Sequence, residues 1–117
     1  MDRFFYLLLQ YSIIIPLFNE EFTIPILLKE LEHYSKDNEI IFIDDGSVDT
    51  SFKLLSKSTF IKLIRIKSNK GKGFAIKKGL CEAKFKKIII TDCDLELRTS
   101  ELKNLMILDR EKNINFV

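Results

Sequence analysis

Cysteine and histidine are scarce in this sequence, and their scarcity narrows the chemistry that the chain can carry. Its 117 residues include only Cys81, Cys93 and His33. Two cysteines do not make the disulfide framework of a small secreted domain, and their spacing does not match a zinc site. A reducing cytoplasm is therefore the expected compartment. The histidine falls late in a predicted helix, where we expect it at the surface rather than in catalysis.

Long hydrophobic runs are also missing. The apolar stretch over residues 4–18 is interrupted by Gln10 and Ser12, contains Pro16 and is too short to cross a bilayer. A signal peptide would need a basic start and a small-residue cleavage site, whereas Asp2 and Arg3 cancel in charge and no such site is evident. We interpret the stretch as a buried strand with an apolar lead-in.

No low-complexity linker or internal repeat divides the chain. With 46% hydrophobic and 31% charged residues, its composition is that of one soluble globular domain, residues 1–117. The net charge of +2 conceals an asymmetry, because residues 1–59 carry −5, residues 60–87 carry +9 and residues 88–117 carry −2. An acidic cleft beside a basic segment suits a metal-bound anionic ligand, and the alternative is a basic face that is only solvated.

Four apolar runs alternate with helical patterns. Residues 13–15, 40–43 and 88–91 predict strands buried on both faces, whereas Lys62 and Arg65 interrupt the run at 60–66 and favour a sheet edge. The alternation predicts a three-layer α/β/α fold with a mostly parallel, open sheet in the order 3-2-1-4. The pattern at residues 114–117 predicts the start of a fifth strand, so we expect part of a longer domain.

Local signals predict where these elements end and what they bury. Pro16 cannot donate to a β-ladder and should end the first strand. Thr23 is placed to cap the first helix, and Asp49 or Thr50 the second. The helical faces expected to be buried are Ile24, Leu27, Leu28 and Leu31; Ile76, Gly79, Leu80 and Ala83; and Leu102, Leu105 and Met106.

Polar clusters follow three of the predicted strands. They are Asn19-Glu20, Asp44-Asp45, and the pair Asp92 and Asp94. Because parallel strands end at one edge of a sheet, these side chains should converge on one crevice. Two carboxylates so close repel each other unless a cation holds them, which indicates Mg²⁺ or Mn²⁺ shared with a phosphate-bearing substrate. The alternative for each cluster alone is a solvated acidic turn or a helix cap.

Taken together, four motifs resemble those of family 2 glycosyltransferases with the GT-A fold. They are residues 15–21 (IPLFNEE), 44–49 (DDGSVD), 69–73 (NKGKG) and 92–96 (DCDLE). The sequence is most similar to the polyprenyl-phosphate (dolichyl-phosphate) mannosyl- or glucosyltransferase type, over residues 13–105. The resemblance implies a UDP- or GDP-linked sugar donor and a membrane polyprenyl phosphate as acceptor. It implies no nucleic-acid partner, and a location in the cytoplasm or at the cytoplasmic membrane surface.

The resemblance also implies roles for individual residues. The nucleotide pocket would be lined by Pro16, Leu17, Asn19, Glu20, Asp44, Asp45, Gly46, Lys72, Gly73, Asp92 and Cys93. Within it, Asp44 or Asp45 would contact the base or ribose, and Lys72 would lie near the phosphates. Asp92 and Asp94 would bind the metal and the diphosphate, with Asp94 as the catalytic residue. Cys93 stands where the family usually has alanine.

Length is the main departure from this family, whose catalytic domains continue through an acceptor-binding half. We therefore expect the N-terminal, nucleotide-binding part, and the alternative to an enzyme is a nucleotide-sugar-binding fragment without catalysis. A phosphoacceptor receiver module also has a parallel sheet and paired aspartates, but its acids follow the first and third strands. A haloacid-dehalogenase-like phosphatase carries its D-x-D on the first strand.

Overall fold

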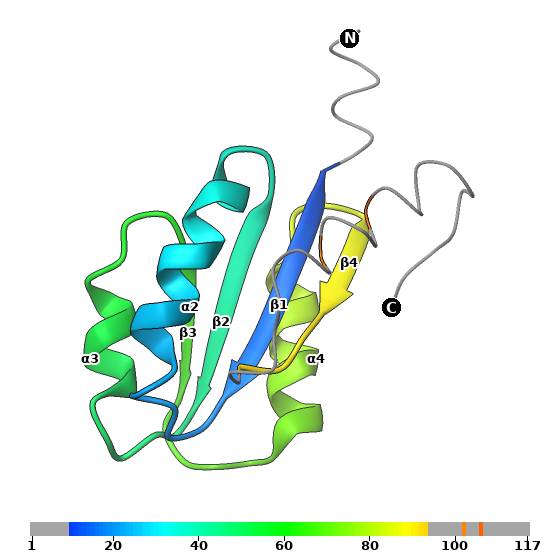
Figure 1. Ribbon diagram of the computed structural model, residues 1–117. Helices are drawn as coiled ribbons and strands as arrows, with labels where there is room; N and C mark the ends of the chain where they lie inside the picture. The colour runs from blue at the N-terminus through cyan, green and yellow to red at the C-terminus, as the bar shows by residue number, and fades with distance from the viewer. Residues whose placement is uncertain (1–9, 94–101, 103–105, 107–117) are drawn as a thin grey trace, which may run out of the picture.

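A four-stranded parallel sheet forms the middle layer of the computed structural model, which describes residues 10–93, Leu102 and Met106 (Figure 1). Its strands are β1 (Tyr11–Leu17), β2 (Glu39–Asp45), β3 (Lys62–Ile66) and β4 (Lys87–Ile90). Their order is β3-β2-β1-β4, and every neighbouring pair is parallel. The predicted order is thereby confirmed, with the mixed third strand at an edge.

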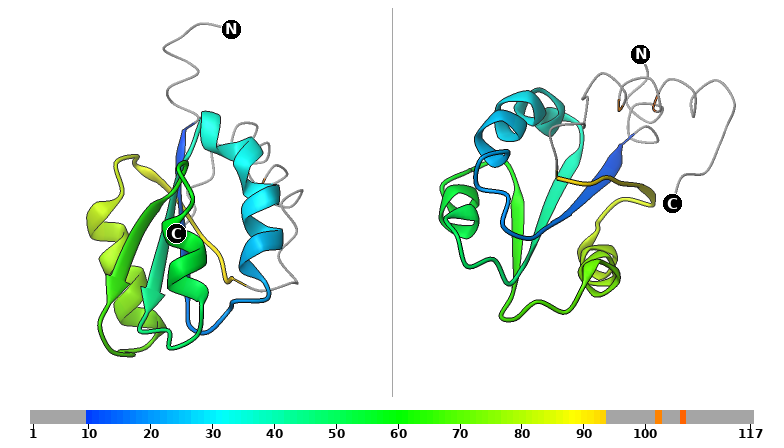
Figure 2. Two further views of the ribbon diagram at one scale, coloured as in Figure 1. Left: turned by 90° about the vertical axis from the view of Figure 1, so that its left-hand side faces the viewer. Right: turned by 60° about the horizontal axis from the view of Figure 1, so that its bottom comes forward.

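Helices cover both faces of this sheet, as Figure 2 shows. α2 (Ile24–Leu31), its 3₁₀ continuation η1 (Glu32–Lys36) and α3 (Ser51–Ser56) lie on one face, and α4 (Lys72–Glu82) covers the other. Leu102 is helical and 2% exposed in the core on the α2 side, and Met106 packs against that core, as predicted. Leu105, the cap expected at Thr99 or Ser100 and the strand expected at 114–117 lie outside the described residues. In the described part, no helix is long and apolar enough to cross a membrane.

The apolar run of β1 is explained by burial on both faces. Ile13 and Ile15 belong to the core under α2 and α3, whereas Ile14 belongs to the core under α4, and all three are 0% exposed. Each such side chain contributes roughly 1.5–3 kcal/mol relative to an exposed one. A strand with helices on both sides therefore needs apolar residues at every position, as the sequence has.

Pro16 does not end β1, contrary to the sequence-based prediction. It pairs with Ile43 of β2 inside the strand. Alternate residues of a strand point their backbone groups to opposite neighbours, and the carbonyl of Ile14 accepts from Thr91 N–H on the β4 side. The N–H group that Pro16 lacks would therefore face the β4 side. Ile14 is the last β1 residue that pairs with β4, so no residue of β4 pairs with Pro16. The strand continues because no ladder hydrogen bond is lost there.

The buried face of α4 agrees only in part with the predicted one: Gly79 is buried and Ala83 packs against the core as expected, but Leu80 does not. Ala75 and Gly79 are buried against the sheet, whereas Leu80, expected inside, is 41% exposed. A Cβ on Gly79 would lie 2.7 Å from Ile14 Cγ2 and 2.9 Å from Ile43 Cδ1. The helix approaches the sheet through its smallest residues, so the bulkier Leu80 is turned away from the core.

The sequence predicted the starts of both α2 and α3, but the capping bond forms only in the second helix, where Asp49 and not its alternative Thr50 makes it. Thr23 and Thr50 occupy the N-cap positions of α2 and α3 and make no side-chain capping bond. The Thr23 hydroxyl donates instead to Glu20 Oε2 at 3.2 Å. Asp49 satisfies the start of α3, because its Oδ1 accepts from Ser51 N at 2.9 Å.

The loops after β1 and β2 are joined by reciprocal hydrogen bonds. Asn19 N donates to Ser47 Oγ at 2.8 Å, and Asn19 Oδ1 accepts from Val48 N at 2.9 Å. Glu20 N donates to Ser51 Oγ at 2.9 Å. Asn19 has φ 52°, a left-handed conformation that asparagine tolerates better than most residues. These bonds hold the two strand ends in one fixed arrangement.

The packing of α4 generates a prediction for Gly79→Ala. The new methyl group meets the branched Cγ2 of Ile14, which cannot swing away, so we expect a loss of about 1–3 kcal/mol in unfolding free energy. Gly73→Ala is the matched control, because nothing lies within 4 Å of its Cβ position. The control should be neutral or slightly stabilising in urea unfolding. Equal stability of the two variants would contradict the close approach of α4.

Asp49 generates a second prediction, on pH. Burial raises the pKa of its carboxyl, but hydrogen bonds from Ser51 and from the backbone of Glu21 outweigh burial and hold the pKa below its usual 3.8. Its stabilising contribution is therefore complete above the unfolded-state pKa and is lost as pH falls through the lower folded-state value. Asp49→Asn should destabilise the protein at pH 7, and the difference from wild type should shrink towards pH 2. Unfolding midpoints across this range measure it, and a difference that stays constant would contradict the assignment.

Candidate functional site

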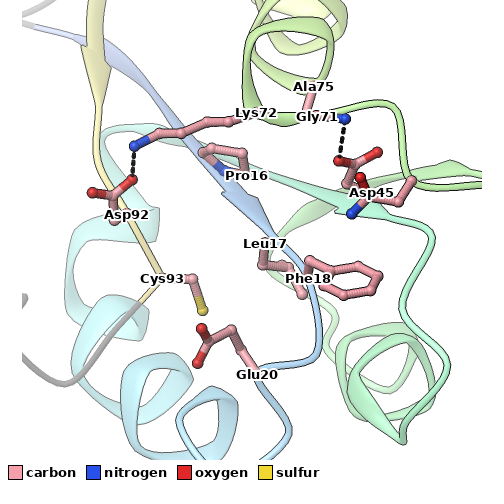
Figure 3. A pocket seen from close by; sticks show the side chains of 11 residues that line it. Pro16, Leu17, Phe18, Glu20, Asp45, Gly71, Lys72, Ala75, Asp92 and Cys93 are labelled. Atoms are coloured by element: carbon pink, nitrogen blue, oxygen red, sulfur yellow. Dashed lines mark hydrogen bonds and ion pairs between the residues drawn. The ribbon is translucent and has the colours of Figure 1, made fainter.

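A cavity of about 500 Å³ opens at the carboxyl edge of the sheet (Figure 3). It lies where β1 and β4 are neighbours although they are far apart in the chain, which is the switch point of the strand order. Its walls come from the ends of β1 and β2, the segment after β4 and the start of α4. The lining residues are Pro16, Leu17, Phe18, Glu20, Asp45, Asn69, Gly71, Lys72, Ala75, Asp92 and Cys93.

Three acidic side chains from three strand ends line this cavity. Glu20 follows β1, Asp45 is the last residue of β2, and Asp92 follows β4. The convergence expected from the sequence is therefore present for these three residues. Asp94, the second half of the expected pair, lies outside the described residues.

Asp45 is tied to the glycine-rich loop. Its Oδ1 accepts from Lys70 N at 2.8 Å. Its Oδ2 accepts from Gly71 N at 2.9 Å, the bond drawn in Figure 3. Gly46 makes this approach feasible, because its φ is 79° and a Cβ there would lie 2.6 Å from Asn69 N. The carboxylate thus holds the loop that precedes α4 against the end of β2, with 4% of its own surface exposed.

Lys72 and Asp92 form an ion pair across another part of the cavity, drawn as a dashed line in Figure 3. The two side chains are 59% and 57% exposed. Such a pair contributes little to stability because water screens both charges. It does place an ammonium and a carboxylate where an incoming anion and cation could each replace one partner.

Several predicted site residues lie outside the cavity lining. Asp44 is fully buried on the other face of β2, where its Oδ1 accepts from Ser47 N at 2.8 Å and its Oδ2 bonds to no described residue. Asn19 and Gly46 act in the loop contacts described above. Gly73 is exposed in the first turn of α4 and also does not line the cavity.

The cavity also contains residues outside the predicted site. Phe18, Asn69, Gly71 and Ala75 line it. Asn69 and Gly71 belong to the glycine-rich motif, which was the available signal for them. Phe18 follows a strand end and is 42% exposed, and Ala75 lies one turn into α4. Phe18 lies within the motif at residues 15–21, which was the signal for it, whereas no pattern in the sequence distinguishes Ala75 from an ordinary packing residue.

The chemistry of the lining suits a phosphate ester. Backbone N–H groups at the start of α4 and the Lys72 ammonium are donors for anionic oxygens. The Asp92 carboxylate offers the oxygen ligands that Mg²⁺ and Mn²⁺ prefer, and a diphosphate would supply further ones. Within residues 10–93, Leu102 and Met106, no cluster of three acidic, histidine or cysteine side chains forms a cation site.

Comparison with solved structures shows the same fold. Staphylococcus aureus TarS in complex with UDP-GlcNAc matches 89% of this chain and 32% of its own, with a TM-score of 0.76 and 22% identity. The mannosyltransferase PcManGT from Pyrobaculum calidifontis, in complex with GDP-Man and Mn²⁺, matches 84% of this chain and 32% of its own, with a TM-score of 0.68 and 20% identity. The predicted GT-A-like architecture is thereby confirmed.

Comparison of sequences finds more similar proteins. A dolichyl-phosphate beta-glucosyltransferase of Dictyostelium discoideum is 37% identical over 98 residues, covering 71% of this chain and 30% of that protein. An undecaprenyl-phosphate 4-deoxy-4-formamido-L-arabinose transferase of Pseudomonas fluorescens is 35% identical over 116 residues, covering 91% and 34%. The chain thus spans about a third of the length of these relatives.

The family model of glycosyl transferase family 2 matches residues 12–113. This range includes all four motifs and every strand of the sheet apart from Tyr11. The match agrees with the cavity at the switch point and with the relatives found by sequence. The chain therefore belongs to glycosyl transferase family 2.

Proposed function

We propose that this protein takes part in transferring a sugar from a UDP- or GDP-linked donor to a polyprenyl phosphate. The observation that carries the proposal is the cavity at the β1–β4 switch point, where Asp45, Lys72 and Asp92 come together in a family 2 chain. The names of the relatives, which act on dolichyl or undecaprenyl phosphate, support the acceptor class. In the reaction, the bond from the sugar's anomeric carbon to the diphosphate breaks and a bond to an acceptor phosphate oxygen forms. The nucleoside diphosphate leaves.

Different parts of the cavity suit different parts of the donor. Asp45 lies at the end of β2 and, as an acceptor, suits the N–H of a base or the hydroxyls of a ribose. Lys72 lies at the start of α4, where the backbone N–H groups of the first turn and the Lys72 ammonium suit the diphosphate. Asp92 lies opposite Lys72, joined to it in the ion pair. The donor would therefore extend from β2 towards β4.

A divalent cation fits this arrangement. Asp92 would hold it, together with Asp94 as the sequence predicts, and the cation would offset the negative charge of the diphosphate. Lys72 would exchange Asp92 for a phosphate oxygen when the donor binds. PcManGT, which shares the fold, was solved with Mn²⁺ and GDP-Man.

Binding without turnover is the second candidate, favoured by the chain's coverage of only about a third of its relatives. In that case the chain would bind the donor, and residues elsewhere would supply the acceptor contacts. A turnover assay with polyprenyl phosphate, run beside donor binding on the same preparation, separates the two. Donor binding without any product would favour this second function.

Asp92→Asn should weaken metal-dependent donor binding. The substitution keeps the side-chain shape and removes one charge, so we expect a loss of roughly 1.5–3 kcal/mol, as for a hydrogen bond to a charged group. Calorimetric titration with UDP- and GDP-sugars, in Mn²⁺ and in EDTA, measures it. Asp37→Asn is the matched control, because Asp37 is exposed at the end of η1 and outside the cavity. Equal binding by wild type in Mn²⁺ and EDTA, unaffected by Asp92→Asn, would rule out the metal role.

Asp45→Asn should behave differently. If Asp45 contacts the nucleoside, its loss weakens donor binding by a similar factor in Mn²⁺ and in EDTA, because the metal is not its partner. The same titrations, with free nucleoside as a further ligand, test this. The unfolding midpoint must be compared as well, since the variant also loses an acceptor for Lys70 or Gly71 N–H. A variant that is folded and binds nucleoside like wild type would exclude the nucleoside role.

A further inference from the structure

The outward surface of α4 is basic and carries apolar side chains among its lysines. We define the α4 outer face as Phe74, Lys77, Lys78, Leu80 and Lys84, all exposed. The opposite side of the helix packs on the sheet through Ala75 and Gly79. The outer face lies in the segment 60–87, which carries a net charge of +9.

The lysines of the α4 outer face outnumber the acidic side chains of the helix. Glu82 is the only acid in α4; it pairs with Lys62 Nζ at 2.8 Å and also interacts with Lys78. Lys77 and Lys78 stand one turn before it and are exposed. A surface with an excess of lysines attracts anions over about a Debye length.

The apolar members of this face are large. Phe74 is 39% and Leu80 is 41% exposed. The ammonium groups of Lys70 and Lys78 lie 5.7 and 5.6 Å from the centre of the Phe74 ring. A cluster of lysines on the surface of a helix is typical of proteins that bind anionic lipid headgroups.

The α4 outer face also lies beside the cavity. The first turn of α4 supplies Lys72 to the cavity, and Phe74 follows two residues later. Figure 2 shows α4 on one side of the sheet and α2 and α3 on the other side. A surface that bound α4 would therefore lie next to the site at the carboxyl edge.

We propose that the α4 outer face docks this protein on the surface of an anionic membrane. The lysines meet the lipid phosphates, and Phe74 and Leu80 enter the interfacial layer between them. A lipid surface fits better than a nucleic acid because the aliphatic Leu80 gains free energy in lipid and finds no stacking partner on a base. This proposal goes beyond the proposed function, since it concerns the surface on which the protein docks and not the ligand that the cavity binds.

Co-sedimentation with vesicles tests the docking. The full chain should bind vesicles of phosphatidylcholine with phosphatidylglycerol, bind pure phosphatidylcholine at least tenfold less, and be released by 0.5 M salt. Lys77→Gln and Lys78→Gln together should weaken binding to the anionic vesicles about fivefold for each lysine removed. Leu80→Ser should also weaken it, while leaving the charge unchanged.

Lys53→Gln with Lys57→Gln is the matched control. These lysines are exposed and lie in and directly after α3, on the opposite side of the sheet, and the pair removes the same charge. Equal losses from the α3 and α4 pairs would overturn the proposal, because binding would then follow net charge alone. So would tight binding of a single-stranded RNA or duplex DNA that Leu80→Ser leaves unchanged, together with no binding to vesicles.

The vesicles contain neither polyprenyl phosphate nor nucleotide, so this result is independent of the donor titrations. Loss of vesicle binding with donor binding intact would overturn the docking alone. Vesicle binding without any donor binding would leave the docking standing and overturn the proposed function. Unfolding midpoints of the variants, all at exposed positions, confirm that each is folded.

Discussion

Burial of β1 on both faces is the constraint on which the rest of this structure depends. The side chains of Ile13, Ile14 and Ile15 are shielded by α2 and α3 on one side and by α4 on the other. A strand can be covered in this way only in the middle of a layered sheet, where parallel crossovers carry helices to both faces. The central strand thereby brings the ends of β2 and β4 to the same edge as its own.

That edge becomes a site because its loops are held by side chains acting on backbone groups. Ser47 and Ser51 accept from the loop after β1, and Asp45 accepts from the glycine-rich loop. Loops at a sheet edge have many unpaired N–H groups, and each short polar side chain satisfies one or two of them. Asp45 thus both lines the cavity and holds one of its loops in place.

Acidic and basic side chains occupy different elements of this sheet edge. Acidic residues follow the strand ends, and basic residues lie along α4, so the two meet at the ion pair between Lys72 and Asp92. A ligand that combines a cation with a diphosphate complements both sides of this boundary. The α4 outer face continues this basic side away from the cavity. The same helix can therefore present positive charge both to a diphosphate in the cavity and to an anionic membrane surface.

The sequence by itself determined the sheet and its order. Three runs of apolar residues with no interruption predict strands with two covered faces, and the lysine and arginine at 62 and 65 place the third strand at an edge. Because the ends of parallel strands share an edge, the convergence of Glu20, Asp45 and Asp92 also follows from the sequence. The four motifs then identified the family, since their order and spacing reflect the same strand ends.

Only the tertiary structure decided which residues face which way. Asp44 and Asp45 are equivalent as a pair in the sequence, but neighbours in a strand point to opposite faces, and only the extension of β2 to Asp45 shows which of them lines the cavity. Pro16 stays within β1 because the N–H that it lacks would face β4, and β4 pairs with β1 only as far as Ile14. The buried face of α4 follows Gly79 and not Leu80, since the distance between helix and sheet is decided by the isoleucines opposite. Each of these outcomes depends on a neighbour distant in the chain, which is information that local patterns do not contain.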